Sequence, residues 1–307
     1  MDKINSFSEY QEQYKKSVDN PDAFWSEQAS TFLWKKKWDR VLDWEFKTPS
    51  VNWFVNGKLN ITENCLDRHL DTKADKTAII WEPNNPNEKH KEITYKELHE
   101  KVCRFSNVLK ANGAKKGDRI CLYMPMVPEL AIATLACARI GAIHSVVFAG
   151  FSAKALSDRI NDADCNILVT SDGLYRGKKQ MCLKDIVDDA LQTCPTINSC
   201  IVLQRTGQQI TMKDGRDSWW HEEDELVNSI CDPEIMDSED PLFVLYTSGS
   251  TGKPKGVQHH CGGYMVYAEY SFRNVFQYND GDIYWCTADI GWVTGHSYII
   301  YGPLSNG

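Results

Sequence analysis

The chain has 307 residues, of which 42% are hydrophobic, 25% charged and 11% aromatic, and its formal net charge is −8. This length allows one large α/β domain or two smaller ones, with enough apolar residues for a sizeable core. The composition excludes disordered, collagen-like and coiled-coil classes, and the acidic balance argues against nucleic acid as a partner.

The first residues and the cysteines bear on the compartment. The polar start, Met1–Ser6, lacks the apolar stretch of a secretory signal. The closest two of the eleven cysteines, Cys194 and Cys200, do not have the short spacing of a zinc site, so we expect no metal. Three cysteines lie in apolar surroundings and are predicted to be buried: Cys121, Cys137 and Cys286. These features together favour a cytoplasmic protein with reduced thiols.

Residues 1–62 differ from the rest of the chain. Ser6 and Glu9 have the spacing of a capping box and predict the start of an amphipathic helix, which Asn20 and Pro21 end. A second short helix and aromatic, loop-like segments follow. The apolar residues of the two helices are Tyr10, Tyr14, Val18, Phe24, Trp25, Ala29 and Phe32. We expect residues 1–62 to form an N-terminal layer packed on a larger body.

From Thr62 onward apolar strands alternate with helices. The predicted helices are 62–70, 94–113 with a Thr94–Glu97 capping box, 129–140, 152–163 and 183–191; the predicted strands are 77–81, 119–123, 143–148, 166–170 and 200–203. This alternation is typical of βαβ units. It predicts the α/β class with a doubly wound, mostly parallel sheet.

One apolar stretch, Leu130–Phe151, has the length of a membrane span. Arg139 near its centre would be costly in lipid, so no membrane association is expected. We interpret the stretch as a buried helix to Ile140, a stop at Gly141 and a buried strand.

Residues 204–239 are polar and irregular. Trp219 and Trp220 precede an acidic run there, which we interpret as a solvated surface segment with tryptophans covering its neighbours. Asp240 and Pro241 then introduce a strand at 242–246. We expect this strand to open a second sheet, and hence a second, incomplete subdomain starting near 241.

The segment after that strand, 246–256, combines hydroxyl residues, glycines and lysines. Glycines let backbone N–H groups approach a ligand, hydroxyls donate hydrogen bonds and lysines add positive charge, which suits a polyphosphate. The loop is not a Walker A motif, because Thr247 stands where glycine is needed and Pro254 follows Lys253. The alternative interpretation is a glycine-rich hairpin loop without a ligand. Lys255 is a weaker candidate than Lys253 for binding phosphate, because Pro254 is expected to turn its side chain away.

Residues 246–256 resemble the phosphate-loop signature of the adenylate-forming superfamily, which includes acyl-CoA synthetases. Further segments resemble the AMP-forming acetyl-CoA synthetases: Asn64–Leu70, Tyr123–Glu129, Ala136–Ala142, Gly215–His221 and Trp285–Tyr298. The similarity runs from about Tyr10 to Gly307. It implies that 1–62 is the N-terminal extension of these synthetases and that 63–307 is the N-terminal part of the AMP-binding (adenylation) domain.

The resemblance implies a two-step ligase reaction. Acetate attacks the α-phosphate of ATP, which carries Mg²⁺, giving acetyl-adenylate and pyrophosphate; CoA then attacks the adenylate and releases AMP. The resemblance assigns the β- and γ-phosphates to Thr247, Ser248, Gly249, Ser250, Thr251, Gly252 and Lys253. Donors of this kind act by positioning and electrostatics.

The resemblance also implies a site for the nucleotide part of CoA, at Arg176, Gly177, Lys178 and Lys179. Arg176 matches the first of two arginines in the family pattern, and Lys179 replaces the second. Lysine keeps the charge but loses the bidentate geometry of arginine. From the residues alone, a solvated basic turn is the better interpretation.

Trp292, Val293 and Thr294 resemble the family's acyl pocket, and Thr294 would also lie near the pantetheine end of CoA. Their apolar character alone predicts that Trp292 and Val293 are core residues. We expect His296 to be structural, and no general base is assigned. His259 and His260 are adjacent on a strand and so point to opposite faces, which argues against a metal site.

The family's later motifs, including the hinge and the C-terminal lysine, do not occur in these 307 residues. We therefore expect an N-terminal part that is inactive alone and poorly stable after Pro241, with no catalytic residue assigned. Two alternatives stay open. One is a propionyl-CoA or other short-chain acyl-CoA synthetase, and the other is a non-catalytic module that binds CoA or nucleotide. The sequence does not indicate an oligomeric state.

Overall fold

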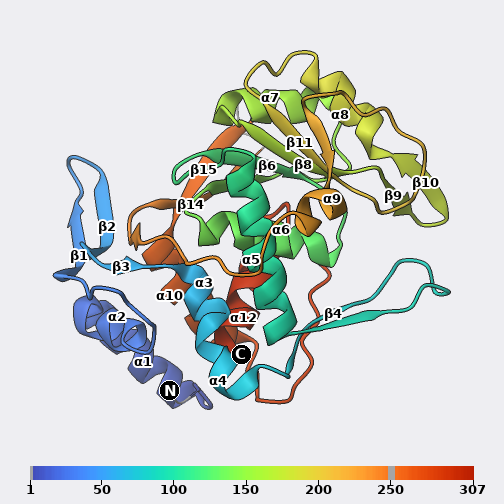
Figure 1. The fold of residues 1–307 in the computed structure, drawn as a ribbon. Helices are drawn as coiled ribbons and strands as arrows, with labels where there is room; N and C mark the ends of the chain where they lie inside the picture. The colour runs from blue at the N-terminus through green and yellow to red at the C-terminus, as the bar shows by residue number, and fades with distance from the viewer. Residues whose placement is uncertain (1–2, 248–252) are drawn as a thin grey trace.

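The computed structural model describes residues 3–247 and 253–307. Its centre is a seven-stranded sheet with the order β12-β11-β8-β6-β7-β14-β15 (Figure 1). The strands are β6 (Arg119–Tyr123), β7 (Ile143–Val146), β8 (Ile167–Ser171), β11 (Ser199–Leu203), β12 (Asp217–Trp219), β14 (Pro241–Thr247) and β15 (Lys255–His260). Only the β14–β15 pair of this sheet is antiparallel. The predicted α/β class with a mostly parallel sheet is confirmed.

Helices cover both faces of the sheet (Figure 1). On one face α5 (Tyr95–Ala111) packs against α6 (Pro128–Arg139), and on the other α7 (Ala153–Ala163) packs against α8 (Leu183–Leu191). Neighbouring residues of β6 serve different cores, because Ile120 belongs to one buried cluster and Cys121 to the other. This alternation is the period of a strand buried on both sides.

Local signals in the sequence account for several element boundaries. Thr94 caps α5, with its hydroxyl accepting from the Glu97 N–H and the Glu97 carboxylate accepting from the Thr94 N–H. Gly141 has φ +71 after α6, a conformation that favours glycine. The expected buried helix, stop and buried strand over 130–148 are confirmed. None of the helices among the described residues is long and apolar enough to cross a membrane.

The N-terminal layer consists of α1 (Phe7–Asp19), α2 (Pro21–Ala29), and the short strands β1 (Arg40–Glu45), β2 (Ser50–Val55) and β3 (Lys58–Leu59). The layer joins the body through α2, where the Phe24 ring packs edge-on against Tyr270 of α10 (Cys261–Val275). By contrast, α1 buries no residue, so the layer expected over residues 1–62 packs on the body through α2 and not through α1. Its rings stack on one another instead, with Tyr10 and Tyr14 centroids 6.1 Å apart.

The helix predicted over 62–70 is broken into α3 (Ile61–Cys65), the 3₁₀ turn η1 (Asp67–His69) and α4 (Leu70–Lys73). The break at Leu66 places Asp67 against Arg139 of α6, with two contacts of 2.8 and 3.0 Å. A buried guanidinium needs such a partner, and the ion pair therefore explains why the regular helix stops here.

The remaining elements lie outside the main sheet. They are the hairpins β4 (Thr77–Trp81)–β5 (Lys91–Thr94) and β9 (Gly173–Arg176)–β10 (Lys179–Cys182), the strand β13 (Met236–Asp237), the helix α9 (Trp220–Glu225), and a C-terminal run of α11 (Val293–Gly295), the π-helical turn η2 (His296–Tyr301) and α12 (Gly302–Asn306). Trp220 is buried and stacks on Phe105 at 3.5 Å, so it is core rather than surface cover. All cysteines are free, and Cys286, unlike Cys121 and Cys137, is not fully buried.

The strand predicted to open a second sheet joins the main one instead. β14 pairs in parallel with β7, and Phe243 is the register partner of His144. The expectation of a separate sheet from residue 242 is therefore wrong. The physical reason is that the backbone N–H and C=O groups along one edge of β7 would otherwise be unpaired. β14 pairs with this edge through its own backbone groups.

Phe243 fixes this junction. It is fully buried, and its ring centroid lies 4.4 Å from those of both His259 and His296 and 4.9 Å from that of Tyr264. These three residues come from β15, η2 and α10. One side chain therefore holds together four elements beside the β7–β14 pair of the sheet.

We predict that Phe243→Ala destabilises the chain by about 3–5 kcal/mol, because the truncation leaves a cavity that four elements cannot all close. The matched control is Phe46→Ala, since Phe46 is 83% exposed. Urea unfolding of the two variants measures both free energies. Equal losses in both variants would show that Phe243 is not the junction residue.

Candidate active site

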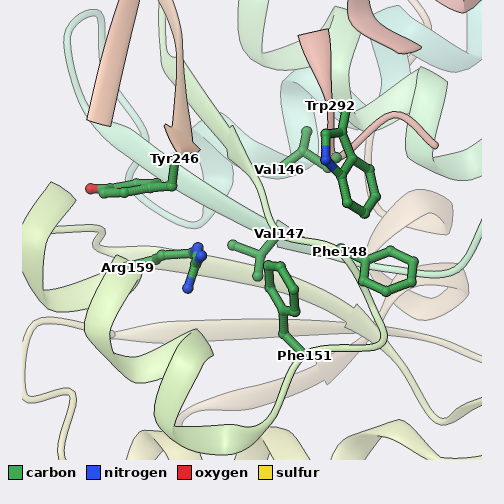
Figure 2. Close-up of a pocket in the computed structure, with 8 residues that line it drawn as sticks. Val146, Val147, Phe148, Phe151, Arg159, Tyr246 and Trp292 are labelled. Carbon is green, nitrogen blue, oxygen red and sulfur yellow. The ribbon is translucent and has the colours of Figure 1, made fainter. Parts of the chain in front are cut away.

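A small pocket of about 30 Å³ lies where β7 and β14 end (Figure 2). Ligands bind at this carboxyl edge in open α/β sheets. The pocket is lined by Val146, Val147, Phe148, Phe151, Arg159, Tyr246, Gly291 and Trp292. Figure 2 shows the Tyr246 ring above the Arg159 guanidinium, with Phe148 and Trp292 on the other side.

Trp292, Val293 and Thr294 lie at the rim of this pocket or next to it in the chain. Trp292 is 48% exposed and its ring centroid lies 5.0 Å from that of Phe148. Val293 and Thr294 are exposed as well. The prediction from apolar character that Trp292 and Val293 are core residues is therefore wrong, because an exposed rim and a core have the same residue types.

The turn before Trp292 is held by Asp289. The Asp289 carboxylate accepts a hydrogen bond from the Gly291 N–H at 2.7 Å, and its carbonyl accepts one from the Trp292 N–H at 3.1 Å. This side-chain turn fixes the direction in which the chain leaves towards α11. A Cβ at Gly291 would lie 3.2 Å from the backbone nitrogen of Phe148, so glycine allows the two pocket walls to approach closely.

His296 also stabilises this turn, through a hydrogen bond to its backbone. Its Nδ1–H donates to the Trp292 carbonyl at 3.2 Å, and its ring lies parallel to that of His144 with centroids 5.4 Å apart. His144 in turn contacts the Tyr301 hydroxyl at 3.2 Å. Burial lowers the pKa of His296 to about 4, so both the expected structural role and a neutral ring fit its surroundings.

The candidate phosphate loop connects two adjacent antiparallel strands. Thr247 ends β14 and is the register partner of Lys255 on β15. Thr247 and Lys253 are exposed. The loop residues Ser248, Gly249, Ser250, Thr251 and Gly252 lie outside the described residues. The strands on either side of the loop are hydrogen-bonded neighbours, and both interpretations of the loop, with and without a phosphate ligand, stay predictions.

Two residues that contact the start of this loop, Asp162 and Arg159, were missed by sequence reasoning. The Tyr246 hydroxyl donates to Asp162 of α7 at 2.7 Å, and the Arg159 guanidinium of the same helix lies 5.6 Å from the Tyr246 ring centroid. The only sequence signal was charged residues beside the apolar positions Leu156 and Ile160. α7 thus holds the residue from which the loop departs.

The predicted CoA residues lie elsewhere in the fold. Arg176, Gly177, Lys178 and Lys179 form the exposed tip of the β9–β10 hairpin, where Gly177 has φ +61. Figure 1 shows this hairpin at the right of the view, beyond the opposite end of the sheet from β14 and β15. No hydrogen bond or ion pair joins the tip to Trp292–Thr294 among the described residues. The structure therefore does not bring the two predicted sites together.

The tip is anchored by the β4–β5 hairpin and by a loop after β11. The Asn84 amide donates to the Gly177 carbonyl at 2.9 Å. The Arg205 guanidinium lies 5.2 Å from the ring centroids of both Trp81 and Tyr175, and it forms an ion pair with Glu88 at 2.8 Å.

Comparisons with known proteins place this geometry in a family. Residues 66–307 match the model of the AMP-binding enzyme family, which covers well over half of the chain. The chain belongs to the AMP-binding enzyme family. Residues 10–65 match a second model, described as the acetyl-coenzyme A synthetase N-terminus.

Individual relatives of this AMP-binding protein support the same family. It is 55% identical to an acetyl-coenzyme A synthetase of Bdellovibrio bacteriovorus over 98% of this chain and 47% of the relative, and 58% identical to that of Desulfatibacillum aliphaticivorans over 97% and 46%. The solved structure of acetoacetyl-CoA synthetase from Streptomyces lividans superposes with a TM-score of 0.88 at 26% identity, covering 98% of this chain and 45% of that one. The chain spans about half the length of the curated relatives it matches.

His296 makes the stability of this AMP-binding protein sensitive to acid. The folded state keeps His296 neutral down to about pH 4, whereas the unfolded chain takes up a proton below about pH 6.5. The unfolded state therefore binds more protons between these values, and stability falls as the pH falls through them, by about 3 kcal/mol from this residue.

We predict that His296→Asn reduces the loss of unfolding free energy on acidification, because the amide keeps a donor for the Trp292 carbonyl but does not titrate. Unfolding free energies at pH 7, 6 and 5 measure the slope. His144 and His259 also have lowered pKa values and leave a residual slope. An unchanged slope in His296→Asn would exclude the assigned role.

Gly295 provides a second test of the rim. A Cβ at this position would fall on the carbonyl oxygen of Asp289, a backbone atom that cannot rotate away. We predict that Gly295→Ala destabilises the chain by about 2 kcal/mol. Thr294→Ala, next to it with an exposed side chain, is the control and should change stability by less than about 0.5 kcal/mol. Thermal unfolding compares the two variants.

Proposed function

We propose that this chain is the N-terminal part of an acetate–CoA ligase that forms AMP. The observation that carries the proposal is that both family models match in tandem, the acetyl-coenzyme A synthetase N-terminus over 10–65 and the AMP-binding enzyme over 66–307. The 55% identity to a protein named acetyl-coenzyme A synthetase supports the same activity. Since the chain spans about half of that relative, the complete reaction is assigned to a protein of the relative's length.

In the proposed reaction the acetate carboxylate attacks the α-phosphate of ATP, and pyrophosphate leaves. The Thr247–Lys253 loop is proposed to bind the β- and γ-phosphates, with Lys253 neutralising charge on the leaving group. The thiol of CoA then attacks the acetyl-adenylate carbonyl, and AMP leaves. Donors directed at phosphate oxygens favour the first step by positioning and by stabilising the charge that develops.

Trp292, Val293 and Thr294 are proposed to line the acetyl group's pocket, with Thr294 also near the pantetheine end of CoA. The exposed Trp292 ring against Phe148 supports this role, because an apolar rim beside a strand edge can receive a small acyl chain. The Asp289 turn and His296 hold these residues in place.

The exposed tip at Arg176–Lys179 is proposed to bind the phosphates of CoA. It presents three cationic side chains on four successive residues, and its exposure leaves their donors available. CoA joins its nucleotide to its thiol by an extended pantetheine arm, so the proposed nucleotide site and the proposed acyl pocket need not be adjacent. Lys179 is expected to contribute charge rather than a bidentate contact.

Magnesium is proposed only as the ion that accompanies ATP. Among the described residues no group of three or more acidic, histidine or cysteine side chains could hold a metal. We propose acetate, Mg-ATP and CoA as the substrates, and neither nucleic acid nor a membrane as a partner. The free cysteines support a reducing compartment, and we propose the cytoplasm.

The decisive experiment replaces the matching N-terminal part of the Bdellovibrio relative with residues 1–307 of this chain. We expect the chimera to catalyse acetate-dependent exchange between ATP and pyrophosphate and to form acetyl-CoA. The 307-residue chain alone is the control and should do neither. Arg176→Ala in the chimera should raise the KM for CoA by about tenfold, because a charge-assisted contact is lost, with little change in the exchange reaction.

Propionate and acetoacetate are assayed beside acetate, since the superposition on acetoacetyl-CoA synthetase from Streptomyces lividans makes a different acyl group a specific rival. Higher kcat/KM on either acid would replace acetate in the proposal. A folded chimera that binds CoA but exchanges no pyrophosphate with any acid would favour a non-catalytic binding module.

A further inference from the structure

Arg159 is a buried cation that has no acidic partner in the part of the chain that the structure describes. It lies on α7, is 8% exposed, and donates through Nη1 to the Ala155 carbonyl at 2.6 Å. No ion pair joins it to a carboxylate within residues 3–247 and 253–307. Guanidinium stays protonated at any relevant pH, so its charge has to be compensated where it lies.

The nearby acids are engaged elsewhere. Asp162 accepts from the Tyr246 hydroxyl at 2.7 Å, and Asp158 forms an ion pair with Lys154. The rings of Phe151 and Tyr246 compensate part of the charge, with centroids 4.6 and 5.6 Å from the guanidinium carbon. Aromatic rings do not replace an anion as acceptor for the N–H donors of the guanidinium, however, and the residues that the structure describes accept from only its Nη1.

Arg205 shows what the same arrangement looks like when it is complete. It too lies between two aromatic rings, those of Trp81 and Tyr175, but a carboxylate of Glu88 meets it at 2.8 Å. The buried Arg139 has Asp67 in the same way. Among the described residues Arg159 has two rings but no anion, and it is the one of these three arginines that lines the pocket at the strand edge.

We propose that Arg159 is an anion-binding residue that receives a phosphate oxygen pair of a diphosphate group in this pocket. The planar guanidinium can donate two parallel hydrogen bonds to two phosphate oxygens. Apolar side chains that exclude water on one side of the site strengthen this contact. Figure 2 shows the guanidinium between Tyr246 and Phe151, beside the side chains that enclose the pocket. The diphosphate is a phosphoanhydride of either a nucleotide or CoA, and this assignment rests on the proposed ligase function.

Calorimetric titration of the 307-residue chain tests the proposal with two probes, inorganic pyrophosphate and CoA. Arg159→Gln should weaken binding of one or both probes by at least about tenfold, and Arg159→Lys should weaken it less, because the charge stays but the fork is lost. Arg205→Gln is the matched control and should leave pyrophosphate binding unchanged. A cooperative thermal unfolding transition shows that each variant is folded. If Arg159→Gln does not fold, the comparison with the unaltered chain uses Arg159→Lys.

The two probes separate the possible sources. Loss confined to pyrophosphate assigns the site to the nucleotide, loss confined to CoA assigns it to the CoA diphosphate, and loss of both assigns a shared subsite. The proposal is overturned if the unaltered chain binds neither probe, if Arg159→Gln binds as it does, or if Arg205→Gln loses pyrophosphate equally. Arg159-dependent binding in a chain whose chimera lacks ligase activity would remove the proposed function and keep this site.

Discussion

The parallel pairing of β7 with β14 is the constraint on which the candidate site depends. Phe243 makes this pairing possible, because its ring fills the space between the sheet and the elements that follow. Without it, the Tyr246 end of β14 and the Trp292 turn would have no common support. The pocket, the start of the candidate phosphate loop and the exposed rim therefore arise from one junction between strands that are about a hundred residues apart in the chain.

Buried charges connect the outer parts to this framework. The Asp67–Arg139 pair joins the 3₁₀ turn η1 to α6. Burial opposes ionisation of Asp67, but hydrogen bonds from His99 and Arg139 outweigh this effect and keep its pKa low. On the other side of the sheet, the fully buried Lys184 meets Asp217 at 2.8 Å. Pairs of this kind add little net stability but specify which segments meet, because a mismatched partner would leave a charge alone.

The sequence predicted the local structure well and the long-range structure less well. Thr94 with Glu97 and Gly141 gave correct helix limits because caps and left-handed residues act within a few positions. The placement of β14 in the first sheet was missed, because the residues of a strand do not by themselves determine which strand it pairs with. The break at Leu66 depends on Arg139, which lies far along the chain. Exposure of Trp292 and the role of Arg159 follow only from what surrounds them in space.

The stack of Trp81, Arg205 and Tyr175 has a consequence for the basic tip at Arg176–Lys179. A two-residue turn on a lone hairpin samples many orientations, and a ligand that binds it must remove that freedom. Here the ring stack, the Glu88 ion pair and the Asn84 hydrogen bond remove much of it during folding. The ordering entropy is then lost once, before any ligand arrives, so the tip can bind a flexible anionic partner with a smaller entropic penalty.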